Sequence, residues 1–158
     1  MMGNDPRFEP IFEKDGVAMI PDRWKIDFLV AAGELSRFFL ELKENAKLFG
    51  MKCPRCGVTY FWPRSWCHRC YEDCEWVEMS GKGAVTLFTK VDISLNDLQT
   101  EVPFIQGGVL VDGAAYPVVC FIRSDDFSTL KRGMRVHAEF VPEEQRTGRI
   151  RDFYFVPD

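Results

Sequence analysis

Four cysteines form the part of this sequence with the most specific chemistry. They occur as two C-x-x-C pairs, Cys53/Cys56 and Cys67/Cys70, with ten residues between the pairs. Each pair can form a tight turn that presents two thiolates to one metal ion, and two such turns complete a tetrahedral four-sulfur site. A closed site of this kind leaves no position for water or substrate. The spacing therefore predicts structural Zn2+ rather than zinc catalysis.

An iron site of the rubredoxin kind is the alternative metal centre, because it uses similar turns. Such turns typically carry a glycine after the second cysteine. Here Gly57 follows the first pair, but Tyr71 follows the second. This departure favours zinc.

The segment between the cysteine pairs combines aromatic rings with cations. From Lys52 through Cys70 there are four Lys or Arg residues and no acids, in a chain whose net charge is −4. Aromatic rings can stack on a base, and arginines can pair with phosphates. The segment predicts a site for a phosphorylated, nucleotide-like ligand or an acidic partner. The alternative is that the rings cover the metal and the cations are solvated.

The remaining reactive side chains do not form a catalytic motif. Cys120 lies in an apolar run and is expected to be a buried small hydrophobe, whereas Cys74 is expected to be left out of a metal site that four sulfurs already satisfy. His68 lies inside a metal turn, and His137 alternates with apolar residues on an expected strand. No independent catalysis is predicted.

Four segments are expected along the chain. Residues 1–26 form an irregular arm, and 27–50 form an amphipathic helical segment with Asp27 as N-cap and Gly50 as stop. Residues 51–78 form a rubredoxin-like zinc ribbon. Residues 79–158 form a five-stranded OB-fold barrel with a short helical element between strands three and four. The fold class is therefore mainly β with an N-terminal helix.

The strands of the barrel are expected from apolar and alternating runs. They cover Val85–Ile93, Phe104–Val111, Val118–Arg123, Val136–Val141 and Ile150–Val156. Gly107-Gly108 predicts a bulge or bend inside the second strand, and Asp112-Gly113 predicts the turn that follows it.

Composition narrows the function classes. The hydrophobic fraction is 46% and the net charge is −4, which indicates a packed protein and disfavours a general nucleic-acid binder. No apolar run approaches the roughly 20 residues needed to cross a bilayer. The first ten residues lack a secretory apolar region. A cytoplasmic location is expected, in agreement with metal-bound thiolates rather than disulfides.

The order of motifs resembles the DUF35 family of zinc-ribbon/OB-fold, acyl-CoA-associated proteins over roughly residues 35–158. The shared features are a helix ending in Leu42-Lys43-Glu44 and Leu48, Cys53-x-x-Cys56-Gly57, Pro63-Arg64, Cys67-x-x-Cys70, and the glycines Gly81 and Gly83 before an OB-type half. The resemblance implies that the four cysteines bind zinc. It also implies a non-catalytic subunit that joins thiolase-superfamily enzymes or related acyl-CoA complexes.

The function expected from this resemblance is support of a thiolase-like catalytic subunit within a hetero-oligomer. The complex would be an acyl-CoA acyltransferase, with benzoylsuccinyl-CoA among the candidate substrates. The residues expected to hold the nucleotide end of CoA are Arg55, Arg64 and Arg69 for phosphates and Trp62 or Trp66 for adenine. The alternatives are a partner subunit of an acyl-CoA hydratase or aldolase, a nucleic-acid-binding ribbon/OB module, and a redox protein that uses iron.

Overall fold

A computed structural model describes residues 10–22, 28–93 and 101–158 of the chain. Its contacts divide the chain into two units, Met1–Ala31 and Ala32–Asp158. The four segment limits expected from the sequence remain predictions. The predicted N-cap at Asp27 lies outside the described residues.

The first unit contains a β-hairpin. Strand β1 (Phe12–Lys14) pairs antiparallel with β2 (Val17–Met19). The two residues between them, Asp15 and Gly16, both have positive φ, 52° and 78°. Positive φ at both central residues is what a type I′ hairpin turn requires, and Asp-Gly is a preferred pair for it. The arm expected to be irregular over 1–26 thus contains regular structure, and the Asp15-Gly16 dipeptide is the signal that was missed.

The second unit begins with a short helix. A 3₁₀ turn over Gly33–Leu35 leads into α1 (Ser36–Asn45), which is shorter than the helical segment expected over 27–50. Gly33 has a φ of +56°, and Ala46 at the C-cap is left-handed. These two positions limit the helix, because neither backbone conformation continues a right-handed one. The amphipathic face is confirmed by its buried residues, Phe38 and Leu42.

The ribbon is a three-stranded sheet. Strand β3 (Phe49–Lys52) lies between β4 (Thr59–Tyr60) and β5 (Glu75–Glu78), and both pairings are antiparallel. Gly50, expected to stop the helix, is inside β3. A Cβ atom there would lie 2.6 Å from the Tyr60 carbonyl oxygen, so the sheet requires a residue without a side chain at this point.

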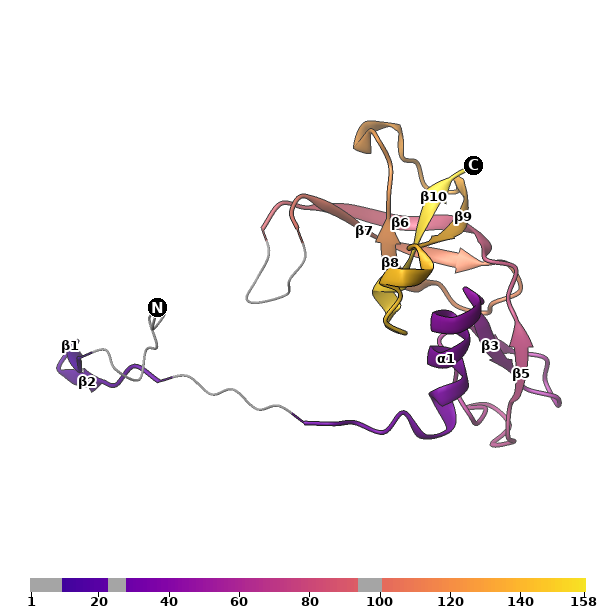
Figure 1. Cartoon of the computed structure of the whole chain (residues 1–158), viewed down its shortest axis with the longest axis horizontal. Helices are drawn as coiled ribbons and strands as arrows, with labels where there is room; N and C mark the ends of the chain where they lie inside the picture. Colours follow the sequence, from indigo (N-terminus) through magenta and orange to yellow (C-terminus); the bar gives the residue numbers. More distant parts are fainter. Residues whose placement is uncertain (1–9, 23–27, 94–100) are drawn as a thin grey trace. The chain divides into compact units, whose positions relative to one another are not determined.

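The C-terminal half is a closed five-stranded barrel, as predicted. Its strands are β6 (Lys82–Val91), β7 (Phe104–Val111), β8 (Val118–Ile122), β9 (Arg135–Phe140) and β10 (Phe153–Pro157). Their order around the barrel is β10-β8-β7-β6-β9, with β9 closing onto β10 and β8 running parallel to β10 (Figure 1). A 3₁₀ helix at Phe127–Thr129 occupies the connection in which a helical element was expected. This arrangement confirms the OB-type barrel.

The predicted irregularity at Gly107-Gly108 is found on the neighbouring strand. The register shifts between Val85 and Leu87 of β6, directly across from these glycines. The Thr86 hydroxyl donates to the Gly108 carbonyl at 2.9 Å, and a Cβ atom on Gly108 would lie 2.8 Å from the same Thr86 oxygen. The glycines therefore make room for the bulge of β6 rather than forming it.

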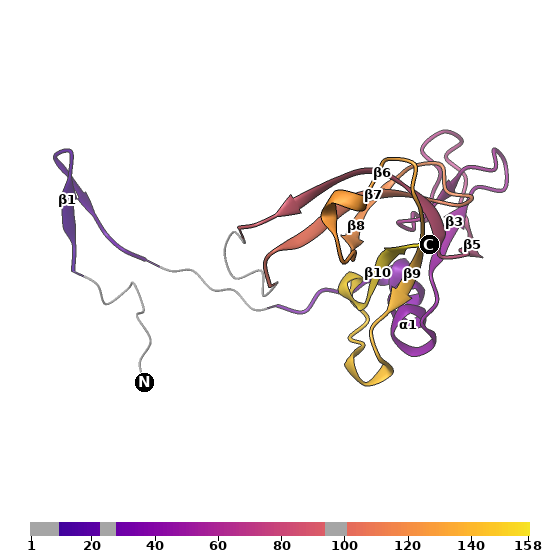
Figure 2. The ribbon, with the colours of Figure 1, turned by 90° about the horizontal axis from the view of Figure 1, so that it is seen from above.

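One hydrophobic core joins the helix, the ribbon and the barrel. Phe38 of α1 packs edge-on against Trp62 with ring centroids 5.7 Å apart, and Trp62 lies 6.2 Å from Phe153 of β10. Figure 2 shows α1, β3 and β5 at one end of the barrel. The ribbon therefore has a fixed place on the barrel within this unit. Within the described ranges, no helix is both long and apolar enough to cross a membrane.

Candidate functional site

The four sulfur atoms converge as the sequence predicts. The Sγ atoms of Cys53, Cys56, Cys67 and Cys70 all lie within 4.8 Å of one another. Cys53 and Cys67 are buried, Cys70 is partly buried and Cys56 is exposed. Four thiolates at this separation could hold one metal ion and are consistent with the structural zinc of a zinc ribbon.

Both cysteine turns use the same backbone hydrogen bonds. In the first, the Gly57 amide donates to the Cys53 carbonyl at 2.9 Å. In the second, the Tyr71 amide donates to the Cys67 carbonyl, also at 2.9 Å. Each turn leaves two side chains on the same side of the chain, aimed at one point. We call these turns the first and second knuckle.

The thiols differ strongly in acidity. A hydrogen bond from the Tyr60 hydroxyl, at 3.4 Å, lowers the pKa of Cys67 to about 6. Contact with the Cys56 sulfur, followed by burial, raises the pKa of Cys70 to about 12. Crowded thiols cannot all ionise unless a cation neutralises them, and a metal ion supplies that charge. The donor set therefore fits a thiophilic metal.

The other two cysteines stand apart from this convergence. Cys74 is buried, and burial raises the pKa of its thiol. Cys120 is partly buried in the barrel, where its thiol lies 3.7 Å from the Gly107 carbonyl and burial raises its pKa to about 12. Both thiols are thus protonated at neutral pH.

The second knuckle is connected to the barrel through aromatic side chains. The Tyr60 hydroxyl lies 2.7 Å from Nδ1 of His68, and the Tyr60 ring stacks on Tyr116 of the β7–β8 loop at 6.3 Å. Arg69 donates to the Tyr116 hydroxyl at 2.9 Å. Burial raises the pKa of Tyr60 to about 12, so its hydroxyl keeps its proton. The metal turn and the barrel loop therefore share one side-chain network.

The structure separates the five residues expected to bind CoA. Arg64 and Trp66 are in contact, with the guanidinium carbon 4.0 Å from the centre of the indole. Arg69 is engaged with Tyr116, and Arg55 pairs with Glu72 at 3.5 Å. Trp62 is partly buried and packs against the hydrophobic core. Arg64 and Trp66 are thus the only two of the five that the described contacts bring together.

Tyr71 completes this contact and was not among the candidates. Its ring is nearly parallel to that of Trp66, with centroids 6.2 Å apart and 10° between the planes. Trp66 is 44% exposed and Tyr71 is 81% exposed. We call Arg64, Trp66 and Tyr71 the ribbon stack. The sequence feature that could have indicated Tyr71 is that a tyrosine, and not a glycine, follows the second cysteine pair.

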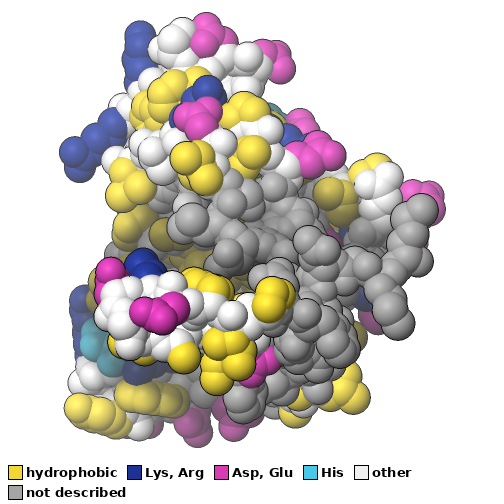
Figure 3. All heavy atoms as spheres, turned by 90° about the vertical axis from the view of Figure 1, so that its left-hand side faces the viewer, with side chains coloured by type: hydrophobic (Ala, Val, Ile, Leu, Met, Phe, Trp, Pro, Cys, Tyr) yellow, Lys and Arg dark blue, Asp and Glu magenta, His cyan; other side chains and the backbone are white. Residues whose placement is uncertain are grey.

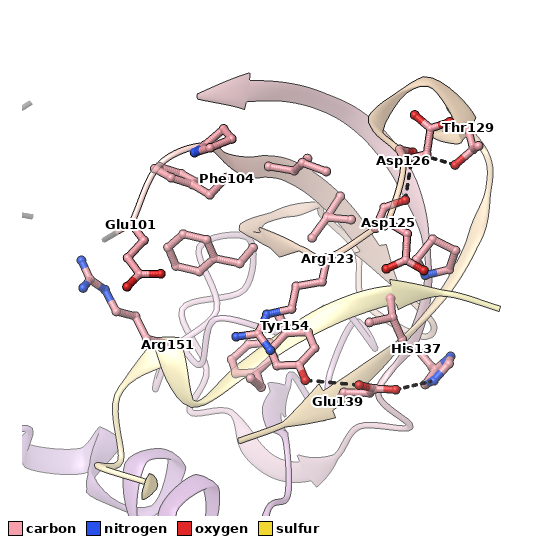
Figure 4. Close-up of a pocket in the computed structure, with 18 residues that line it drawn as sticks. Glu101, Phe104, Arg123, Asp125, Asp126, Thr129, His137, Glu139, Arg151 and Tyr154 are labelled. Carbon is pink, nitrogen blue, oxygen red and sulfur yellow. Dashed lines mark hydrogen bonds and ion pairs between the residues drawn. The ribbon is translucent and has the colours of Figure 1, made fainter. Parts of the chain in front are cut away.

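A second feature lies on the barrel and contains none of the predicted ligand residues. A groove of about 1140 Å3 runs over the ends of β7 and β8 and along β9 and β10 (Figure 4). The Arg123 guanidinium lies 3.6 Å from the centre of the Tyr154 ring, and the Tyr154 hydroxyl donates to Glu139 at 3.2 Å. Its lining comes from four strands and their loops, which are distant from one another in the sequence, so sequence periodicity alone did not single it out.

The groove carries charges of both signs. Its cations are Arg123 and Arg151, and its acids are Glu101, Asp125, Asp126 and Glu139. Asp126 accepts hydrogen bonds from Ser128, and His137 lies 2.8 Å from Asp158 through Nδ1. An excess of acids over arginines makes this groove a poor site for a polyphosphate.

Comparisons with known proteins agree with this architecture. No protein-family model matches the sequence. A DUF35 domain-containing scaffold protein of Methanocaldococcus jannaschii is 29% identical over 82 residues. That match covers 51% of this chain and 58% of the relative, so it spans somewhat more than half of the relative's length.

Two solved structures share the fold. The Ltp2-ChsH2(DUF35) aldolase matches with a TM-score of 0.66 at 18% identity, covering 82% of this chain and 98% of that chain. A protein of unknown function from the DUF35 family of Sulfolobus solfataricus matches with a TM-score of 0.58 at 19% identity, covering 80% and 87%. At these identities the likeness concerns the fold.

Proposed function

We propose that the chain is a member of the DUF35 family and a non-catalytic subunit that supports an enzyme acting on acyl-CoA thioesters; the similarity to DUF35 proteins in sequence and in fold supports this assignment. The observation that carries the proposal is the closed four-cysteine site. A metal there has all its positions filled by protein sulfur, so it stabilises the ribbon and leaves the chemistry to a partner. The similarity to a scaffold protein supports the same role.

The partner we propose is a thiolase-like catalytic subunit in a cytoplasmic hetero-oligomer. A hydratase or aldolase partner is the competing proposal, and the name of the Ltp2-ChsH2(DUF35) aldolase supports it. The nucleophile of either reaction would belong to the partner. In both cases this chain would contribute binding and positioning.

The ribbon stack is the proposed contact for the nucleotide end of CoA. Two exposed, parallel rings at Trp66 and Tyr71 offer a surface for adenine, and Arg64 beside them offers a guanidinium for a phosphate. Tyr71 replaces Trp62 in this role, because Trp62 is partly buried against the core. Arg55 and Arg69 stay in the proposal as secondary phosphate contacts.

The ribbon is preferred over the barrel groove for reasons of charge. CoA carries a pyrophosphate and a 3′-phosphate, whereas the groove has twice as many acids as arginines. The ribbon segment from Lys52 through Cys70 has only cations. The same net charge of −4 opposes a general nucleic-acid role for the whole chain.

The mechanism that follows is positioning. Adenine and phosphate held at the ribbon stack place the distant thioester at the partner's reacting centre. Binding energy from the remote nucleotide thereby lowers the entropy loss of the chemical step. This chain's residues bind and orient, and they exchange no proton with the thioester.

The test begins with native purification of the complex and mass spectrometry of the proteins that accompany it in stoichiometric amount. A thiolase, hydratase or aldolase among them identifies the partner class. CoA affinity of that complex is then measured for Arg64→Glu, which reverses the charge of the stack. We expect affinity to fall about tenfold or more, the loss of one charge-assisted contact.

Arg123→Glu is the matched control, because Arg123 is also an arginine stacked on an aromatic ring, but in the barrel groove. Its CoA affinity should stay within about twofold of the wild-type value. A larger loss with Arg123→Glu than with Arg64→Glu would move the CoA site to the groove. A clean monomer with no accompanying enzyme would overturn the proposed function itself.

A further inference from the structure

The groove on the barrel is a second feature that the proposed function leaves unused. Its volume of about 1140 Å3 exceeds the roughly 300–1,000 Å3 of small-molecule pockets. It crosses β7 and β8, the second and third strands of the barrel, and its lining includes Glu101 from the connection before β7 and Arg151 from the connection before β10. This face and these two connections are where OB barrels bind extended polymers. Size and position therefore favour a chain-like ligand.

The floor of the groove follows an incomplete seam in the barrel wall. Strand β10 pairs with β8 at a single position, Phe155 with Ile122. Ile122 lines the groove together with Phe121 on one side of the seam and Phe153 and Tyr154 on the other. A seam between two strands is long and narrow, so its shape suits an extended segment better than a folded surface.

The groove carries charges of both signs that remain available to a ligand. Asp126 accepts a hydrogen bond from Ser128, and Glu139 accepts one from Tyr154, so these two acids are engaged internally. Four charged lining residues form no salt bridge with any residue in the described part of the chain: Arg123, Arg151, Glu101 and Asp125. Two cations and two acids are thus left, a balance that disfavours both a polyanion and a polycation as the ligand.

Two simpler explanations of the groove are disfavoured. Figure 3 shows acidic and basic side chains interspersed with hydrophobic ones on one face of the molecule, so a mixed composition alone is ordinary. The groove differs because it is hollow and keeps four charges unpaired. Among the described residues, only the four ribbon cysteines converge as a metal-ligand group, so the acids of the groove are not a cation site.

The chemistry of the lining changes along the groove. Figure 4 shows Phe104 toward one end, Arg123 in the middle and Asp125 toward the other end. The Phe104 ring packs edge-on against Phe121 with centroids 5.4 Å apart, which gives the first end an apolar wall. The Arg123 guanidinium lies on the Tyr154 ring, a contact that leaves its N–H groups for an acceptor. The matching ligand has an apolar, an acidic and a basic group in this order.

We propose that the groove binds an extended segment of the catalytic partner subunit that carries a large apolar, an acidic and a basic side chain in this order. The apolar side chain packs on Phe104, the acidic one meets Arg123 and the basic one meets Asp125. This inference rests on the proposed function, because that function supplies the partner. The groove would join the two subunits at the barrel, while the ribbon stack contacts the nucleotide.

The first test is photo-crosslinking in the native complex. The photoreactive residue p-benzoylphenylalanine is placed at Phe104 or, as the matched control, at Leu110, which is 38% exposed on the same strand and lies outside the groove. The proposal expects Phe104 to crosslink to one peptide of the protein that accompanies the wild-type chain stoichiometrically. That peptide should contain the three side chains in order, and Leu110 should not crosslink to it.

The outcomes separate the two proposals. A crosslink from Phe104 into this chain, a second copy or nucleic acid overturns the docking inference and leaves the proposed function standing. Failure of Phe104 to crosslink in a preparation that contains the enzyme, or equal crosslinking from Leu110, overturns it too. Absence of any stoichiometric enzyme in the wild-type preparation overturns both. The CoA titration of Arg123→Glu uses excess partner subunit, so that weaker assembly is not mistaken for weaker CoA binding.

The second test titrates the crosslinked peptide, made by synthesis, against the full chain. Asp125→Lys should raise its Kd at least about tenfold, because repulsion between like charges replaces attraction. Glu144→Lys is the matched control, since Glu144 is also an exposed acid but lies outside the groove, and its Kd should stay within about twofold of the wild-type value. Circular dichroism verifies that both variants are folded. An unchanged Kd for Asp125→Lys would overturn the docking inference.

Discussion

The two knuckles have matching backbones but different surroundings. Each closes with the same amide-to-carbonyl bond, and each ends in a left-handed residue, Gly57 at φ 73° and Tyr71 at φ 57°. Gly57 has open space around its Cα, whereas Tyr71 carries an exposed ring parallel to Trp66. Metal binding needs the turn alone, so the residue after the second cysteine is free to serve another purpose. A tyrosine held in this disfavoured conformation points to a role outside the metal site.

The knuckles also differ in their side-chain contacts with the rest of the protein. The first has one exposed ion pair, Arg55 with Glu72. The second contacts the barrel through Arg69 and, by way of His68 and Tyr60, through Tyr116. A change at the second knuckle should therefore disturb the barrel loop, while an equivalent change at the first should stay local.

The largest expected effect is loss of the metal, and it should be the same whichever knuckle loses a cysteine. Cys53→Ser and Cys67→Ser should each abolish stoichiometric zinc, measured by elemental analysis. The associated loss of folding free energy is on the order of 10 kcal/mol for such a site. Cys74→Ser is the control and should retain zinc. If Cys74→Ser also released the metal, the assignment of the four ligands would be wrong.

The next largest effect is a difference in stability between substitutions at the two knuckles. Tyr60→Phe removes a buried hydroxyl that contacts both His68 and Cys67, and should lower the free energy of unfolding by about 1–2 kcal/mol. Arg55→Ala at the first knuckle should cost less than about 0.5 kcal/mol, because its ion pair is exposed. Chemical denaturation of both zinc-loaded variants gives the comparison. If the two variants lost equal unfolding free energy, the contacts between the second knuckle and the barrel would add no stability.

Substitutions at the two equivalent left-handed positions should have opposite signs. Gly57→Ala should destabilise the protein by about 1 kcal/mol, since the cost comes from φ and not from a clash. Tyr71→Gly should stabilise it by up to about 1 kcal/mol while weakening CoA binding by the complex. Thermal unfolding and ligand titration measure the two quantities. Destabilisation by Tyr71→Gly would mean that the ring packs for stability rather than for binding.

The smallest expected effect concerns the acid side of the pH profile. Arg135 hydrogen-bonds Asp112 at the end of β7 and holds the pKa of that carboxyl below its usual value. A depressed pKa contributes stability that is present above about pH 4 and is lost as pH falls through the folded pKa. Tm measured from pH 7 to pH 3 should therefore fall less for Asp112→Asn than for the wild type. If Tm fell equally with pH in both proteins, the Arg135–Asp112 ion pair would not contribute to stability.

The features that local spacing encodes were predictable. The two C-x-x-C pairs specify their own turns, and apolar and alternating runs located all five barrel strands to within a few residues. Phe38 and Leu42 follow helical spacing and are buried as that spacing predicts. These signals depend on neighbours one to four residues away, which a sequence displays directly.

Contacts between residues far apart in the sequence were decided only by the tertiary structure. Trp62 and Trp66 are four residues apart in one aromatic run, yet the first packs against Phe38 and Phe153 while the second is exposed beside Tyr71. The barrel groove depends on the register of β9 with β10, and the pairing of the second knuckle with Tyr116 spans 47 residues. Composition determined which chemistries were available to this chain. Non-local packing decided which of them face solvent together, because burial of one ring is a property of its distant neighbours and not of its own position.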